Sequence, residues 1–110
     1  MDKLQEMLTD YRQDLVAVKL VGDEIWEKTG FSPNSLMILA CLAEEPTDIR
    51  RSAIAKKTLL HMSVVVSVLQ VMEKLGLVGR VADRKRRYMI TVSGIERLGA
   101  ARARLQNTEG

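Results

Sequence analysis

The sequence contains few cysteine, histidine, proline and aromatic residues. Its 110 residues include one cysteine, one histidine and two prolines, and aromatic residues make up 4%. A single cysteine excludes an internal disulfide and favours a reducing compartment. No apolar run approaches the ~20 residues of a membrane span, and the N-terminus lacks the apolar segment of a signal peptide. We therefore expect a cytoplasmic protein that does not enter a membrane.

Catalytic groups are scarce as well. His61 lies in a predicted turn, and Cys41 lies among apolar neighbours, where an inert core thiol is favoured over a redox switch. The chain has no zinc-ligand spacing, no phosphate-binding glycine loop and no paired carboxylates. We predict that the protein is not an enzyme and holds no metal or cofactor.

The charge is unevenly distributed along the chain. The net charge is +3, but residues 47–90 contain ten basic and three acidic residues, a balance of +7. Residues 1–46 contain four basic and nine acidic residues, a balance of −5. A positive field confined to one part of a chain is typical of a surface that meets a polyanion.

Residues 63–75 have the periodicity of an amphipathic helix. Gly76 follows where a helix end favours a left-handed residue. A shorter helix at 52–58 precedes it, which predicts a helix-turn-helix. The expected buried side is Val65, Val68, Leu69, Met72 and Leu75, and the expected open side is Ser63, Val64, Ser67, Gln70, Val71 and Lys74.

Residues 79–92 change to the period of a β-strand. Tyr88, Ile90 and Val92 alternate with more polar positions, and the tip, residues 83–87, contains no apolar residue. The pattern predicts a β-hairpin with a strongly basic tip and, before it, a brief strand at 49–50. The fold class is therefore mainly α with a small β-hairpin.

The segment IAKKTLLHMSVVVSVLQVMEKLGLVGRVADRKRRYMITVSGIERL resembles the winged helix-turn-helix of the MarR superfamily, with the related PadR group close behind. The matching pieces, in order, are Ile54-Ala55, the run 72–78, Asp83-Arg84, and the run 90–94. The resemblance implies one domain, residues 1–110, with a winged helix-turn-helix at 32–92, a recognition helix at 63–75 and a wing at 79–92.

The resemblance also implies a dimeric, sequence-specific DNA-binding transcription regulator, a repressor acting on a short palindrome. The recognition helix would lie in the major groove and the wing on the backbone or in the minor groove. The expected base-contacting residues are Ser63, Val64, Ser67 and Gln70. The expected backbone or minor-groove residues are Lys56, Lys57, Arg84, Lys85, Arg86 and Arg87. A small aromatic effector would fit the family, but no residue here indicates its pocket.

A second interpretation stays open. Where the family commonly has an arginine in the recognition helix, this chain has Ser67, and Val64, Val66 and Val71 lie on its open side. Such a helix would either have low sequence specificity, with affinity supplied by the wing, or bind protein. The alternative is a winged-helix interaction module that binds an acidic protein partner.

The two ends of the chain are predicted to be helical. Residues 3–29 have apolar residues at alternating steps of four and three, typical of a helix that meets another helix. This helix would either pack on the core of its own chain or, as we prefer, form the interface of a homodimer together with the last helix, residues 93–107. That last helix is predicted to begin with a capping box at Ser93 and Glu96. Family members usually add a further C-terminal helix to the dimer interface, so here the first and last helices would have to form it. The predicted interface residues are Leu4, Leu8, Tyr11, Leu15, Val18, Ile25, Leu98 and Leu105.

Overall fold

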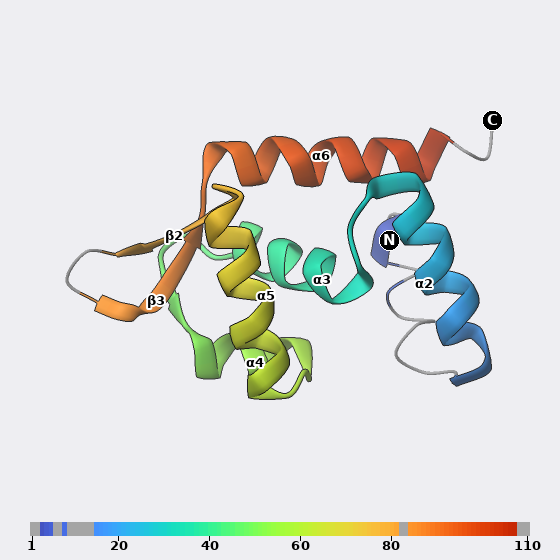
Figure 1. The fold of residues 1–110 in the computed structure, drawn as a ribbon. Helices are drawn as coiled ribbons and strands as arrows, with labels where there is room; N and C mark the ends of the chain where they lie inside the picture. Colours follow the sequence, from blue (N-terminus) through green and yellow to red (C-terminus); the bar gives the residue numbers. More distant parts are fainter. Residues whose placement is uncertain (1–2, 6–7, 9–14, 82–83, 108–110) are drawn as a thin grey trace. The chain divides into compact units, whose positions relative to one another are not determined.

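A computed structural model describes residues 3–5, 8, 15–81 and 84–107 of the chain (Figure 1). Residues 3–5 and 8 are helical. The mainly α class with a small antiparallel sheet is confirmed. The elements are α2 (Leu15–Thr29), α3 (Pro33–Ala43), β1 (Ile49–Arg50), α4 (Arg51–Thr58), α5 (Met62–Lys74), β2 (Val78–Val81), β3 (Arg84–Ile90) and α6 (Val92–Asn107).

The chain divides into two compact units. The terminal unit comprises residues 1–33 and 99–110, and the winged-helix unit comprises residues 34–98. Whether residues 3–29 form one continuous helix depends on residues 6–7 and 9–14, which lie outside the described residues.

The core of the winged-helix unit draws on every one of its helices and strands. Apolar residues of α3 supply much of it, because that helix is apolar on most of its surface. The apolar period of α5 places Val65, Leu69 and Met72 in the same core, as predicted. The buried apolar residues of this unit are Leu36, Met37, Ile38, Leu39, Leu42, Ile49, Ile54, Val65, Leu69, Met72, Leu77, Val78, Tyr88 and Leu98.

Helices α4 and α5 form the predicted helix-turn-helix. Their axes are bent by 114° across the intervening turn, an angle typical of this motif. Leu59 ends α4 in the left-handed conformation with φ 60°, although its side chain is 74% exposed. Among the described residues no single helix has the length and apolar composition of a membrane span; α4 and α5 reach them only when taken together across this bend.

The end of α5 is closed by backbone hydrogen bonds around Gly76. Gly76 has φ +76°, and its N–H donates to the Glu73 carbonyl while the Leu77 N–H donates to the Met72 carbonyl. This pairing satisfies two carbonyls of the last turn, and Leu77 and Met72 are both buried. The prediction that Leu75 is buried is wrong: it caps the helix beyond the core-facing turn and is 57% exposed.

The three strands form an antiparallel sheet in the order β1-β3-β2. Ile49 pairs with Tyr88, and Val78 pairs with Ile90, with an irregularity after Arg80. Strands β2 and β3 project as a hairpin beyond α5 (Figure 1). Burial of Tyr88 is confirmed, but Val92 is 73% exposed because the strand ends at Ile90 and Val92 already begins α6.

Thr91 joins the sheet to α6, which corrects the predicted start of that helix. Its hydroxyl donates to the Gly76 carbonyl at 2.7 Å and accepts from the Gly94 N–H at 3.0 Å. Thr91 is therefore the N-cap of α6, and the predicted capping box at Ser93 and Glu96 is wrong.

Candidate nucleic-acid interface

Helix α5 presents an open face opposite its buried stripe. Ser63, Ser67 and Gln70 are exposed, and Val64 is partly exposed. These are the four residues predicted to contact bases, and the structure brings them together on one side of the helix. Because side chains three, four and seven positions apart share a helix face, they form one continuous strip.

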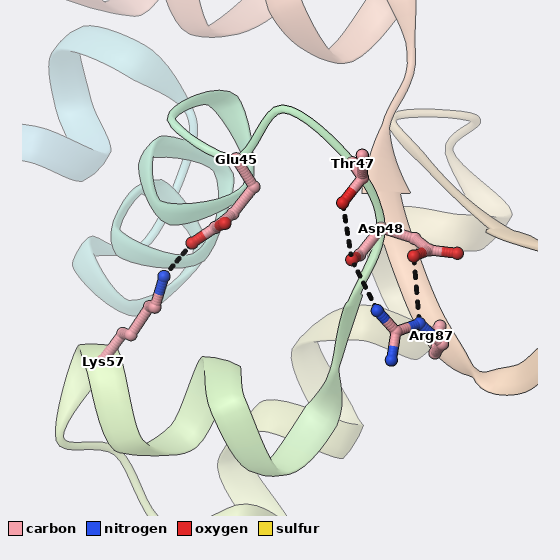
Figure 2. Close-up of polar contacts among 5 residues, drawn as sticks. All are labelled: Glu45, Thr47, Asp48, Lys57 and Arg87. Atoms are coloured by element: carbon pink, nitrogen blue, oxygen red, sulfur yellow. Dashed lines mark hydrogen bonds and ion pairs between the residues drawn. The ribbon is translucent and has the colours of Figure 1, made fainter.

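The supporting helix α4 contributes two lysines at its C-terminal end. Both Lys56 and Lys57 are exposed, which the predicted contact with phosphates requires. Lys57, however, forms an ion pair with Glu45, which follows α3 in the chain (Figure 2). The hydrogen bond to Glu45 raises the pKa of Lys57 above its usual value. Of the two lysines, only Lys57 is engaged by Glu45, whereas Lys56 is not.

In the structure the wing consists of β2, β3 and their connection. It contains the densest run of basic residues in the chain. Arg86 is exposed on β3. The structure describes only the backbone of Arg84 and Lys85, so the positions of those two side chains stay outside the description. Arg86 is thus the predicted wing contact whose exposed side chain the structure places.

Arg87 differs from its neighbour because Asp48 holds its guanidinium group. Its Nε donates to Asp48 Oδ1 at 2.9 Å, and its Nη2 donates to the Asp48 carbonyl oxygen at 3.1 Å (Figure 2). The two side chains are only 27% and 12% exposed. The same carbonyl accepts a 3.4 Å hydrogen bond from Thr47. This pair fastens β3 to the segment that leads into β1.

A second arginine fastens the wing to α5. Arg80 on β2 donates through Nε and Nη2 to both carboxylate oxygens of Glu73, at 2.8 and 3.0 Å. Its guanidinium carbon lies 5.9 Å from the centre of the Tyr88 ring. The hydrogen bond to Glu73 raises the pKa of Arg80 above its usual value. Two-point contact to a carboxylate fixes orientation as well as distance.

These acidic partners are what the sequence argument missed. Glu45, Asp48 and Glu73 contributed only to the charge balance of the sequence, yet each engages a cation of the basic half. Arg80 and Glu73 are seven residues apart, but α5 ends between them. The helical repeat therefore does not predict their contact. The pair of Arg87 with Asp48 spans 39 positions and has no periodic signal at all.

The predicted dimer residues lie mainly inside the single chain. Leu4, Leu8, Ile25, Leu98 and Leu105 are buried, each at 8% exposure or less. The side chains of Tyr11, Leu15 and Val18 lie outside the description. Contact of any of these residues with a second chain stays a prediction, and the five buried ones are not surface residues of this structure.

Residues 34–82, which include the whole helix-turn-helix, match the family model described as the IclR helix-turn-helix domain. Among solved structures, the chain is similar to a point mutant of Staphylococcus aureus MepR bound to an oligodeoxyribonucleotide. The identity is 24%, the match covers 83% of this chain and 70% of that chain, and the TM-score is 0.67. The chain has the winged helix-turn-helix fold of the MarR-family regulators.

Two further structures show the same likeness. BldR from Sulfolobus solfataricus is 23% identical, with 97% of this chain and 78% of that chain covered and a TM-score of 0.73. The MarR family transcription regulator SP03579 is 17% identical, with 96% and 74% covered and a TM-score of 0.74. A comparison with curated proteins gives no match. The predicted MarR-type fold is confirmed, and BldR and SP03579 are themselves described as transcription regulators.

Proposed function

We propose that this protein is a dimeric, sequence-specific DNA-binding transcription regulator that works in the cytoplasm and represses transcription. The observation that carries the proposal is the open face of α5, with Ser63, Ser67 and Gln70 exposed, beside a basic wing. In this geometry α5 enters the major groove and the wing follows the phosphate backbone or the minor groove. The solved MepR structure with a bound oligodeoxyribonucleotide has the same fold, which supports the proposal.

The electrostatics support the same role. Residues 47–90 carry a balance of +7, and exposed Lys56 and Arg86 are available to phosphates. Phosphate contacts supply affinity without regard to sequence, whereas the α5 strip would supply the selection among sequences. Repression follows if a dimer occupies two half-sites of a palindrome and excludes other proteins from that stretch of DNA.

A titration followed by fluorescence anisotropy tests this function. The labelled probe is a pool of random-sequence duplexes, and the titration is repeated at several salt concentrations. We expect the logarithm of the binding constant to fall linearly with the logarithm of the salt concentration, with a slope of about −0.9 per neutralised phosphate. Absence of binding to duplex DNA even at low salt would contradict the proposal.

A second candidate function has an observation of its own. Val71 and Leu75 are 53% and 57% exposed, and exposed apolar side chains on one helix favour a protein contact. In this case the winged helix would be an interaction module, with the basic wing against an acidic partner. Val64→Asp with Val71→Asp would then abolish a protein complex, and DNA binding of the unaltered chain would be weak and unselective.

A further inference from the structure

The open face of α5 has a composition that limits which bases it can recognise. Two rows run along it. The polar row is Ser63, Ser67, Gln70 and Lys74, all exposed, and the apolar row beside it is Val64, partly exposed, and Val71, 53% exposed. Members of each row are three, four or seven positions apart, so each row follows one line on the helix surface.

Guanine has no matched partner on this face. Its major-groove edge presents two acceptors, N7 and O6, which are contacted by the paired donors of arginine or by lysine. Within Met62–Lys74 the only cation is Lys74, the last residue of the helix, which lies farther than Gln70 and Val71 from the N-terminal end that enters the groove.

Cytosine also lacks a partner. Its major-groove donor, N4, is contacted by a carboxylate acceptor. Glu73 is the one acid within Met62–Lys74, and both of its oxygens already accept hydrogen bonds from Arg80. The ion pair that fastens the wing therefore also removes the only carboxylate of α5 from base recognition.

Adenine and thymine do have partners. The Gln70 amide can contact N6 and N7 of adenine with a donor and an acceptor, and the apolar row offers Val64 and Val71 to the C5 methyl group of thymine. Met62, 43% exposed at the start of α5, adds a third apolar side chain near the end of the helix that enters the groove. Serine hydroxyls contact either kind of pair.

We propose that α5 recognises A·T base pairs, with Gln70 on adenine and the row of Val64 and Val71 on thymine methyl groups, so the preferred sites of this protein are A·T-rich where α5 enters the groove. The inference rests on the proposed DNA binding. It gives the exposed valines a role in selecting DNA, so a protein partner is not required to cover them.

Thymine methyl groups can be removed one at a time without changing base pairing, which makes the test direct. Duplexes are first selected from the random pool by binding, and the selected bases are determined. Each thymine of the preferred duplex is then replaced by deoxyuridine, which lacks only the C5 methyl group. We expect a threefold to fourfold loss of affinity at each contacted thymine, the equivalent of the ~0.8 kcal/mol of one buried methyl group.

Protein variants assign the contacts. Val71→Ala should weaken binding to the thymine duplex by about the same factor and should no longer distinguish thymine from deoxyuridine at one position. Gln70→Ala should relax the preference for adenine at one position. Alanine has the higher helix propensity, so α5 should remain helical in both variants. Val92→Ala, a valine 73% exposed at the start of α6, is the matched control and should behave as the unaltered protein.

The outcomes separate the inference from the function on which it rests. Selection of G·C-rich duplexes, or equal affinity for thymine and deoxyuridine duplexes, would overturn the inference while DNA binding stands. Binding without any sequence enrichment would also overturn it. Failure to bind any duplex of the pool would remove the proposed function itself, and the inference with it.

Discussion

At the scale of single residues, Cys41 on α3 has a thiol whose chemistry depends on its neighbours. Burial raises the pKa of Cys41, Lys57 lowers it, and Glu45 and Glu44 raise it. The thiolate is the reactive form, so we expect iodoacetamide to alkylate Cys41 more slowly than a free thiol, with a pH profile displaced upward. The raised pKa favours the predicted inert thiol, but Cys41 is only partly buried and is not the core residue that the sequence predicted.

The substitution Glu45→Gln tests whether charged neighbours contribute to the raised pKa of Cys41. The substitution removes a carboxylate that raises the pKa of Cys41 and releases Lys57, which lowers it, so the alkylation profile should move to lower pH. Glu24→Gln is the matched control, because Glu24 pairs with Lys28 on α2 and is not among the groups that shift Cys41. A profile unchanged by Glu45→Gln would show that burial alone sets the pKa.

The same shift determines the sign of a stability effect. A raised pKa in the folded state means that the folded chain binds the thiol proton more tightly than the unfolded chain. The contribution of Cys41 to stability is therefore fully present below the unfolded pKa and is lost as pH rises through the folded value.

Gly94 is a residue for which the fold leaves no room for a side chain. A Cβ atom there would lie 2.1 Å from the Leu77 carbonyl oxygen and 2.6 Å from Cγ1 of Ile90. Because the nearest atom belongs to the backbone, Gly94→Ala should lower the free energy of unfolding by about 1–3 kcal/mol in chemical denaturation.

Gly99 is the matched control for that substitution. It lies in the same helix, α6, and a Cβ atom there would meet nothing within 4 Å. Gly99→Ala should raise the free energy of unfolding by about 0.5–1 kcal/mol, because alanine loses less conformational freedom in a helix. Equal effects of the two substitutions would mean that the approach of Leu77 to Gly94 does not constrain the fold.

At the scale of elements, the wing is fastened on two sides by acid–arginine pairs. Asp48 holds Arg87 on β3, and Glu73 holds Arg80 on β2. The sequence predicted that four residues of the wing contact DNA: Arg84, Lys85, Arg86 and Arg87. The structure instead separates Arg86, which is exposed, from Arg87, whose guanidinium group is engaged within the unit.

This separation gives a paired prediction. Arg86→Ala should leave stability within about 0.5 kcal/mol of the unaltered chain, while the salt slope of DNA binding becomes shallower by about 0.9. Arg87→Ala should lower the free energy of unfolding by about 1–2 kcal/mol, since it breaks two hydrogen bonds of a charged group, and should leave the salt slope unchanged. Denaturation and salt-dependent anisotropy measure the two effects. A shallower slope for Arg87→Ala would identify Arg87 as a phosphate contact after all.

The element boundaries were largely predictable because periodicity and caps act over a few residues. The recognition helix was expected at 63–75 and is observed at Met62–Lys74, and Gly76 has the predicted left-handed conformation. The error at α6 arises because a contact outside the local sequence selects the cap. Ser93 and Thr91 are both capping residues by type, and only the position of the Gly76 carbonyl, which Thr91 contacts across fifteen residues, selects between them.

The candidate site was less predictable than the helices that carry it. The exposed residues of α5 followed from its period, whereas the engagement of Lys57 by Glu45 and of Arg87 by Asp48 requires contacts twelve and 39 positions apart. A sequence pattern marks such cations as basic but does not show which carboxylate they meet. Contact of Lys57 and Arg87 with DNA stays a prediction, although both cations have acidic partners within the chain.

At the scale of the whole molecule, the question is how two recognition helices would be presented to one palindrome. A two-fold dimer places its recognition helices about one turn of DNA apart, ~34–36 Å, to meet two half-sites. The period of residues 3–29 indicated a helix that meets another helix, and Leu4, Leu8 and Ile25 are already buried within one chain. A period identifies an apolar face but does not distinguish a partner in the same chain from one in a second chain.

Sedimentation velocity decides between these partners. We expect a species of twice the 12.3 kDa chain mass and a stoichiometry of two chains per palindromic duplex. Trp26 is the only tryptophan and is 60% exposed on α2, so its fluorescence reports on that helix alone. If a second chain covers α2, emission should shift to the blue as the protein is concentrated through its dimerisation range. A species of single-chain mass at all concentrations, with unchanged emission, would contradict the dimer and would require one chain to recognise a single half-site.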